Sequence, residues 1–252
     1  MIPPFNQDSP SMWQRKAHSW ESDALQGRPM EVIVHGHAGA RVLVFPTSQG
    51  SNHEWEDRGM FAAVGPRIAA GEFQFWCVPS VDALSWYNEA ATPHERAEWQ
   101  DRYDGYLRDE VLPFSRDVND DPFLITTGAS FGGYHAVNFG CRHPELTGRV
   151  LSMSGLVDIT RFTGGVSDDL IYFHNPADFM RHEHDPERLA AFRQMDIILA
   201  VGRDDGLCAG NEAFSAALWQ QGIGNALRVW DGWAHDWPYW HSMLKLYLGG
   251  HD

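Results

Sequence analysis

One segment of the chain sets the architecture around it: Phe123-Leu124-Ile125-Thr126-Thr127-Gly128-Ala129-Ser130-Phe131-Gly132-Gly133. It consists of an apolar run, a Gly-x-Ser-x-Gly sequence and the start of a helix-like stretch that reaches His143. A sharp turn between a strand and a helix exposes a serine hydroxyl above the sheet in strained backbone geometry, and glycines leave the space that such a turn needs. A serine hydroxyl is a strong nucleophile only beside a general base. The segment therefore predicts a buried strand, a tight turn that presents Ser130 as a nucleophile, and a helix that packs closely on the strand through Gly133.

Short apolar runs alternate along the chain with longer helix-like or irregular stretches. Several runs are almost continuously apolar, as is typical of strands that helices cover on both faces. Glu31–His35 and Arg41–Phe45 are joined by the turn-forming segment Gly36–Ala40, so we expect these two strands to form a hairpin. The later strands alternate with helices, which predicts an α/β fold with a mostly parallel, eight-stranded twisted sheet and helices on both faces. The predicted strands are Trp13–Trp20, Glu31–His35, Arg41–Phe45, Phe73–Val78, Phe123–Thr127, Val150–Ser154, Ile197–Val201 and Leu227–Trp230, and the predicted helices are His94–Phe114 (ended near Pro113), Gly132–His143 and Asn211–Gln221.

Two late strands end beside residues that could activate Ser130. After a nucleophile on a strand–turn–helix of this kind, an acid follows a late strand and a histidine follows the last strand. Ile197–Val201 is followed by Gly202-Arg203-Asp204-Asp205, and Leu227–Trp230 by Asp231-Gly232-Trp233-Ala234-His235. We expect His235 to accept the serine proton and return it to the leaving group, while an aspartate holds the imidazole in the required tautomer. Asp204 and Asp205 both fit this position, and the one that does not face the histidine would cap the following turn.

The composition is that of an ordinary globular protein, with 252 residues, 43% hydrophobic and 21% charged. A formal net charge of −15 argues against nucleic acid or a membrane surface as a partner. The three cysteines form no disulfide framework, and Met1 to Trp20 lacks the apolar core of a secretory signal. No apolar run approaches the roughly 18 residues that span a bilayer. We therefore expect a cytoplasmic protein with one domain over residues 1–252, in which Leu156–Arg193 is long enough to form a cap or lid over a site.

Most of the thirteen histidines are expected to be structural or exposed. His135 lies in the helix after Ser130, and we expect it to pack there. The pairs His35 and His37, and His182 and His184, have an i, i+2 spacing that no carboxylate or cysteine completes into a metal site. We expect these four to be solvated loop residues, and we predict neither a metal nor a cofactor.

Eleven tryptophans are a high number for this length. Several lie in segments that this architecture would bring near Ser130. They could wall a cleft for an acyl chain or an aromatic acyl group, or they could fill the core under long loops. Trp86 and Trp237 are our candidates for substrate contact. Gln49 and Asp82 could bond substrate as well, or each could hold its own loop.

Six short motifs follow one another along the chain. They are Val78-Pro79 before Ser85-Trp86-Tyr87, Tyr103-x-x-Tyr106-Leu107-x-x-Glu110-Val111-Leu112-Pro113, Gly128-Ala129-Ser130-Phe131-Gly132-Gly133-Tyr134, His143-Pro144-Glu145, Ser152-Met153-Ser154-Gly155 and His235-Asp236-Trp237-x-x-Trp240. In this order they resemble the Putative esterase family, which includes esterase D (S-formylglutathione hydrolase), feruloyl esterases and the mycolyltransferases of the antigen 85 group. The resemblance covers about Arg41 to Leu248 and implies an α/β-hydrolase fold.

The resemblance also implies roles for individual residues. The family's acid lies in a Gly-x-x-Asp sequence after the late strand, which favours Asp205 over Asp204. Its first oxyanion donor is the amide after the nucleophile, here Phe131, and its second follows the third strand, where the match gives Ser48. Members usually carry His-Gly at that place, whereas this chain has Pro46-Thr47. This departure marks a divergent member, whose substrate cannot be copied from better-known relatives.

Together these features favour one function over two alternatives. We expect a serine esterase that hydrolyses a small-molecule carboxylic ester through an acyl-enzyme on Ser130, with His235 as general base and acid and Asp205 orienting it. The same triad could instead transfer the acyl group to an alcohol or sugar, as the resemblance to mycolyltransferases suggests. The third hypothesis is a binding protein that kept the fold and lost the activity. The oligomeric state stays open, with a homo-oligomer as one outcome.

Overall fold

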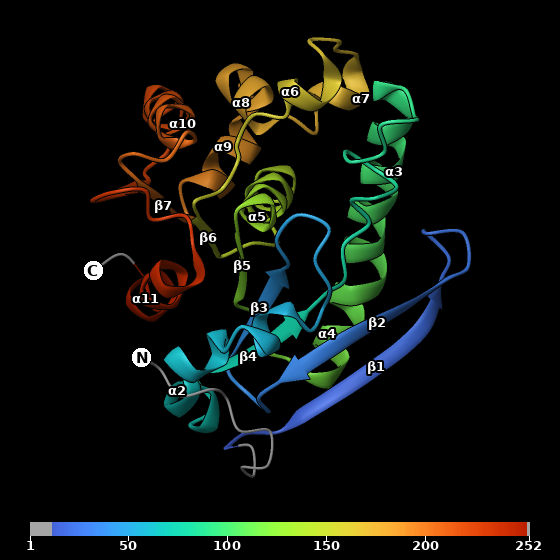
Figure 1. Cartoon of the computed structure of the whole chain (residues 1–252), viewed down its shortest axis with the longest axis vertical. Helices are drawn as coiled ribbons and strands as arrows, with labels where there is room; N and C mark the ends of the chain where they lie inside the picture. Colours follow the sequence, from blue (N-terminus) through green and yellow to red (C-terminus); the bar gives the residue numbers. More distant parts are fainter. Residues whose placement is uncertain (1–11, 251–252) are drawn as a thin grey trace.

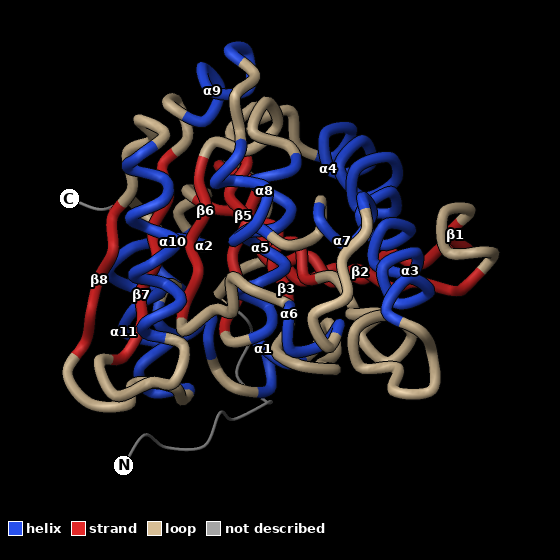
Figure 2. Tube along the Cα trace, turned by 90° about the horizontal axis from the view of Figure 1, so that it is seen from above, coloured by secondary structure: helices blue, strands red, loops and turns tan. Residues whose placement is uncertain are grey.

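Eight strands form one sheet in the computed structural model, which describes residues 12–250. Their order is β1-β2-β4-β3-β5-β6-β7-β8, and Figure 2 shows the sheet extending from β8 at one end to β1 at the other. All pairs from β4–β3 to β7–β8 are parallel, whereas β1–β2 and β2–β4 are antiparallel. The predicted mostly parallel eight-stranded sheet is therefore confirmed, with two antiparallel pairings at one end. The strands are β1 Arg15–Ser22, β2 Arg28–His35, β3 Ala40–Phe45, β4 Phe73–Cys77, β5 Leu124–Ala129, β6 Arg149–Met153, β7 Asp196–Gly202 and β8 Ala226–Trp230.

Helices cover both faces of this sheet, because successive side chains of a strand point to opposite faces and here both sets are apolar. Leu43 and Phe45 of β3 pack into the core under α3, α5 and α10, while Val42 and Val44 pack into the core under η1, α2 and α11. The helices are α1 Glu54–Asp57, η1 Met60–Ala63, α2 Gly65–Ala69, α3 Pro93–Tyr106, η2 Leu107–Val111, α4 Leu112–Val118, α5 Phe131–Arg142, α6 Thr160–Thr163, α7 Asp169–Tyr172, α8 Pro176–Phe179, η3 Met180–His182, α9 Pro186–Phe192, α10 Cys208–Gln220 and α11 Trp237–Tyr247.

The segment Leu156–Arg193 carries the short elements α6 to α9 and η3. Figure 1 shows α6, α7 and α8 along the top of the molecule, between α10 and α3, and α7 lies against α3. Leu156, Ile159 and Ile171 pack with Phe131 of α5 in a separate apolar cluster. The segment therefore lies next to the start of α5, and its role as a mobile cap stays a prediction.

The predicted hairpin between Glu31–His35 and Arg41–Phe45 is wrong. β2 pairs with β1 and β4, and β4 lies between β2 and β3. The connection between β2 and β3 crosses the start of β4 so closely that a Cβ on Gly39 would lie 2.3 Å from the backbone of Glu72. Gly36 and Gly39 have φ of +101° and +86°, which glycine adopts without strain. These glycines thus permit a backbone crossing, and the hairpin of this sheet is β1–β2.

The predicted helix end near Pro113 is also wrong. The helix α3 continues through the π-helical turn η2 into α4 and ends at Val118. Proline lacks an N–H, and its ring clashes with the carbonyl four residues earlier in a regular α-helix. A π turn widens the helix locally. The widened turn just before Pro113 therefore lets the helix pass through the proline.

Some predictions concern residues that the structure does not describe. The secretory-signal prediction falls partly on Met1–Ser11, and the domain prediction includes 251–252, so these parts lie outside the described residues. Within residues 12–250, no helix is both long enough and apolar enough to cross a bilayer. Cys77, Cys141 and Cys208 are all buried free thiols.

Candidate functional site

Ser130 lies in the turn between β5 and α5. Its φ of +56° and ψ of −118° are strained for any residue with a side chain. The turn needs glycine on both sides, because a Cβ on Gly128 would lie 2.3 Å from the backbone of Gly132. A Cβ on Gly132 would lie 2.5 Å from the carbonyl oxygens of Phe45 and Pro46. Residues with a side chain are therefore excluded at positions 128 and 132, and the turn directs the Ser130 side chain away from the sheet.

His235 lies in the loop after β8 and joins Ser130 to Asp205. Its Nε2 is 3.0 Å from Ser130 Oγ, and its Nδ1 is 2.8 Å from Asp205 Oδ2. An ionised carboxylate can only accept hydrogen bonds, so Nδ1 donates to Asp205 and Nε2 is free to accept the serine proton. Asp204 is exposed, and its amide donates to the carbonyl of Gly232. The structure therefore brings Asp205, and not Asp204, to the imidazole.

Close backbone contacts hold the two loops that carry Asp205 and His235. A Cβ on Gly202, at the end of β7, would lie 2.0 Å from the carbonyl oxygen of Trp233. The Ser154 hydroxyl donates to the carbonyl of Ala234, the residue before His235, and accepts a hydrogen bond from the Trp240 indole. The position of His235 is thus set by Ser154 directly after β6, Gly202 at the end of β7 and Trp240 of α11.

In the loop after β3, the amides of Thr47, Gln49 and Gly50 donate hydrogen bonds to other groups of the protein. The amide and hydroxyl of Thr47 donate to the Glu54 carboxylate at 2.7 and 2.6 Å. The amide of Gly50 donates to the carbonyl of Thr47 at 2.8 Å. The amide of Gln49 donates to Asp82 Oδ2 at 2.7 Å. Among residues 47–50, the amide between Thr47 and Gln49 is the one without a partner within residues 12–250.

That amide belongs to Ser48 and donates to no other residue in the range 12–250. The Ser48 hydroxyl accepts a hydrogen bond from the Tyr87 hydroxyl at 2.7 Å, which anchors the side chain. The amide of Phe131 is the first of α5, where no helical carbonyl is available to it. The Ser48 and Phe131 amides are therefore both available to a ligand.

The aromatic candidates differ in their exposure. Trp233 is 56% exposed and stacks on the imidazole of His235, with 5.5 Å between the ring centroids. Trp237 is half-buried, and the Arg58 guanidinium lies 5.3 Å from its ring centroid. Trp86 is fully buried and donates to the hydroxyl of Tyr134 at 2.9 Å. Trp86 therefore supports the core and presents no surface to a ligand.

Sequence reasoning did not connect three residues that the structure joins to this site. In the sequence Tyr87 is only part of a motif, yet in the structure it anchors Ser48. The sequence leaves Asp82 open between substrate contact and loop contact, and it predicts that His135 packs in its helix. Both are buried, and the Asp82 carboxylate accepts a hydrogen bond from His135 Nε2 at 2.8 Å. No local sequence signal pairs residues 53 positions apart.

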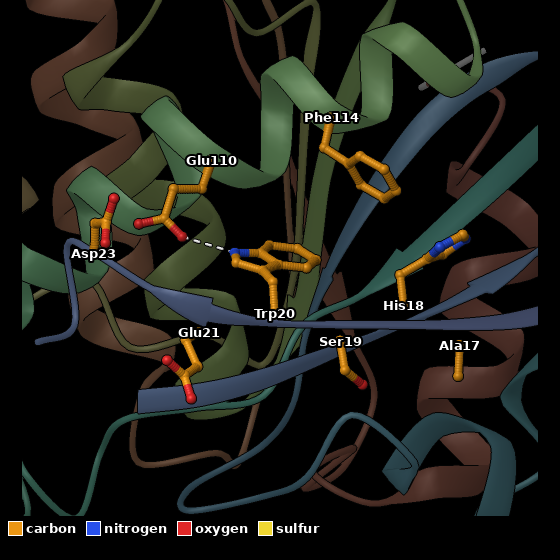
Figure 3. A pocket seen from close by; sticks show the side chains of 8 residues that line it. All are labelled: Ala17, His18, Ser19, Trp20, Glu21, Asp23, Glu110 and Phe114. Carbon is orange, nitrogen blue, oxygen red and sulfur yellow. Dashed lines mark hydrogen bonds between the residues drawn. The ribbon is translucent and has the colours of Figure 1, made fainter. Parts of the chain in front are cut away.

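Two large surface hollows lie elsewhere. One, of about 630 Å³, lies between β1 and the helix formed by η2 and α4. Figure 3 shows His18 and Trp20 of β1 pointing toward Glu110 and Phe114, with the Trp20 indole donating to Glu110 at 2.7 Å. The other, of about 670 Å³, is lined by parts of α3, α5 and α7 to α9. Neither is lined by Ser130, Asp205 or His235.

The histidine pairs do not form a metal site. Within residues 12–250, no group of three or more His, Cys, Asp or Glu side chains is arranged to hold a metal ion. The expectation of a solvated loop residue is wrong for His35, which is 2% exposed and accepts a hydrogen bond from the Trp13 indole. The reason is that β2 extends to His35 and lies between two other strands.

Comparisons with known proteins agree with this geometry. The model of the family described as Putative esterase matches residues 77–249. No curated protein matches the chain. Among solved structures, a ferulic acid esterase is 21% identical, with 92% of this chain and 95% of that chain covered and a TM-score of 0.74.

Two further structures have the same architecture. An S-formylglutathione hydrolase from Agrobacterium tumefaciens is 15% identical, covers 97% of this chain and 96% of its own, and has a TM-score of 0.72. A ferulic acid esterase from Anaeromyces mucronatus, in complex with ferulic acid, is 13% identical, with 96% and 92% covered and a TM-score of 0.68. At these identities the likeness shows the fold, and the implied α/β-hydrolase fold is confirmed.

Proposed function

Because this chain belongs to the Putative esterase family, and so to hydrolases that act on esters, we propose that it hydrolyses a carboxylic ester through an acyl-enzyme on Ser130. One observation carries the proposal. Ser130 Oγ, His235 and Asp205 form a continuous chain of contacts of 3.0 and 2.8 Å. Such a chain is what a hydroxyl needs to lose its proton as it attacks a carbonyl carbon.

In the first half-reaction Ser130 Oγ attacks the ester carbonyl while its proton passes to His235 Nε2. The tetrahedral intermediate collapses when the C–O bond to the alcohol breaks, and His235 returns the proton to the departing alkoxide. A water molecule then attacks the acyl-enzyme in the same way and releases the acid and the free serine. Asp205 stabilises the imidazolium in both halves and holds Nδ1 as the donor.

The tetrahedral intermediate carries a negative oxygen, and two amides are suited to stabilise it. Phe131 offers the first amide of α5, where the helix dipole adds a partial positive charge. Ser48 offers an amide that no other described residue accepts, and hydrogen bonds hold its neighbours Thr47 and Gln49 in place. We assign Phe131 and Ser48 as the oxyanion donors. The contacts of Thr47 and Gln49 replace the missing His-Gly as the means of shaping the loop.

The surroundings of the site favour a small ester with an apolar or aromatic group. Trp233 exposes its ring beside His235, and Trp237 is half-buried in the same segment. Gln49 is exposed next to Ser48 and can bond a polar group of the substrate. Since two of the similar structures are ferulic acid esterases, aromatic acyl esters belong in the first substrate panel.

The test compares hydrolysis of p-nitrophenyl acetate and butyrate by the wild type and by Ser130→Ala. We expect the substitution to remove turnover above background, because removing a triad member leaves only weak residual catalysis. A fluorophosphonate should label the wild type and not Ser130→Ala. The matched control is Ser19→Ala, at an exposed serine of β1. This variant should keep both the turnover and the fluorophosphonate labelling of the wild type. Equal turnover in wild type and Ser130→Ala would refute the proposal.

The same assay separates hydrolysis from acyl transfer. With added acceptor alcohols, a hydrolase releases mainly the free acid, whereas a transferase forms the new ester at modest acceptor concentration. A protein that only binds esters would give neither product and no fluorophosphonate label.

A further inference from the structure

We propose that Asp82 is a positioning residue that, together with His135, aligns the second oxyanion donor with the first. The inference rests on the proposed function, since it concerns the amides assigned to the oxyanion. Asp82 and His135 do not touch the reacting atoms. They act through Gln49 and through helix α5.

Asp82 is a fully buried carboxylate with both oxygens bonded. Its side chain is 0% exposed, Oδ2 accepts a hydrogen bond from the Gln49 amide at 2.7 Å, and Oδ1 accepts one from His135 Nε2 at 2.8 Å. A buried carboxylate is costly unless it is well bonded, and its bonds are stronger than neutral ones. Asp82 therefore cannot serve as a substrate contact in this state, and it joins the loop after β3 to α5.

In the loop after β3, hydrogen bonds hold the residues on both sides of Ser48. Gln49 has a φ of +55°, a conformation that residues with a side chain adopt at a cost, so the loop needs contacts that hold it there. The Asp82 bond to the Gln49 amide supplies one such contact. On the other side of Ser48, Thr47 is bound twice by Glu54. The backbone of Ser48 is thus held at both neighbours, and its own amide stays available.

The helix end of this connection leads to the first oxyanion donor. His135 lies four residues after Phe131 in α5, so the two side chains share a helix face, and their ring centroids are 5.0 Å apart. The contacts run from Phe131 through His135 to Asp82 and on to Gln49. Because each member is buried or bonded, a shift of α5 would be passed to the loop. The two oxyanion amides therefore keep their spacing.

The charge of Asp82 is not essential to this role. What the loop requires is an acceptor for the Gln49 amide, and a side-chain amide carbonyl supplies one. With Asp82→Asn, the new NH₂ group would face His135, which can accept at Nε2 if its proton moves to Nδ1. Gln100 can take that proton's hydrogen bond, because its side chain lies 3.5 Å from Nδ1 and its Oε1 is buried without a partner among the described residues. Asp82→Asn is therefore the conservative variant that should rescue function.

The experiment compares Asp82→Leu, Asp82→Asn and His143→Gln with the wild type. His143→Gln is a matched control, since His143 directly follows α5 as its C-cap and donates from Nε2 to a buried carboxylate, that of Asp104, at 2.9 Å. It lies 13 residues from Ser130, roughly 20 Å along the helix axis. Each variant is assayed for kcat and KM with p-nitrophenyl butyrate, for Tm, and for inhibition by a trifluoromethyl ketone, whose adduct with Ser130 carries a negative oxygen.

We expect Asp82→Leu to lower kcat about 100-fold with little change in KM, as removal or misplacement of one oxyanion donor does. The affinity for the trifluoromethyl ketone should fall in parallel, since both measure stabilisation of the oxyanion. Asp82→Asn should stay within about 10-fold of the wild type. His143→Gln should lower Tm and leave kcat and ketone affinity unchanged.

A folded Asp82→Leu with the kcat and ketone affinity of His143→Gln would overturn the inference, as would an Asp82→Asn as impaired as Asp82→Leu. If Asp82→Leu does not fold, Asp82→Ala removes the same acceptor without adding bulk and carries the same expectation. A failure of the proposed function looks different: Ser130→Ala would then keep the turnover of the wild type, or the wild type itself would show neither turnover nor fluorophosphonate labelling.

Discussion

Asp204 and Asp205 are neighbours in sequence with opposite surroundings. Asp205 is 7% exposed, accepts a hydrogen bond from the Leu207 amide at 3.0 Å, and contacts His235 Nδ1. We predict that Asp205→Asn lowers kcat about 10⁴-fold, because an amide in place of the carboxylate favours the wrong imidazole tautomer. The measurement is the kcat for p-nitrophenyl butyrate at neutral pH.

Asp204→Asn is the matched control at the residue scale. Asp204 is exposed and engages its neighbours through its backbone amide, which the substitution keeps. We expect its kcat to stay within about 3-fold of the wild type, since substitution of an exposed side chain outside the core usually changes the protein little. Similar losses in the two variants would contradict the assignment of the acid.

At the scale of elements, α5 and β3 approach each other through a glycine. A Cβ on Gly132 would lie 2.5 Å from two backbone carbonyl oxygens, which cannot move as a flexible side chain could. We predict that Gly132→Ala lowers the free energy of unfolding by about 3 kcal/mol, the upper part of the usual range for overpacking. Urea denaturation measures this, and the kcat should fall with it because Gly132 adjoins the turn at Ser130.

Gly105 offers the opposite case within α3. A Cβ there would have Ala24 Cβ as a neighbour at 3.9 Å, an ordinary contact, and the residue is inside a helix. Gly105→Ala should therefore raise the free energy of unfolding by about 0.4–1 kcal/mol, through a less flexible unfolded chain. If both variants changed stability in the same direction, the steric argument would be wrong.

One carboxylate, that of Glu110, connects the β1–β2 hairpin to the helix formed by α3, η2 and α4. Glu110 of η2 accepts hydrogen bonds from the Trp20 indole, the Ser22 hydroxyl and the Ala24 amide at 2.7, 2.9 and 2.9 Å, and Figure 3 shows the first of these. We predict that Glu110→Ala lowers the free energy of unfolding by about 2–3 kcal/mol, since it leaves three donors without their acceptor. The control is Glu21→Ala, an exposed residue of the same strand, expected within about 0.5 kcal/mol of the wild type. Equal unfolding midpoints in urea for the two variants would contradict a stabilising role for the Glu110 hydrogen bonds.

Features that depend on near neighbours could be predicted from the sequence. The turn at Ser130 follows from the sterics of Gly128 and Gly132, and the central strands follow from continuous apolar runs. The order of serine, acid and histidine indicated which loops meet. These features could be predicted because bond geometry and burial act over a few residues.

Contacts between distant segments became clear from the tertiary structure. It placed β4 between β2 and β3, carried the helix past Pro113 through a π turn, and selected Asp205 for His235. It also joined Asp82 to His135 across 53 positions and buried Trp86. The physical reason is that such contacts depend on how whole elements pack, since the pairing of a strand edge or a buried carboxylate is set by whatever the fold brings beside it.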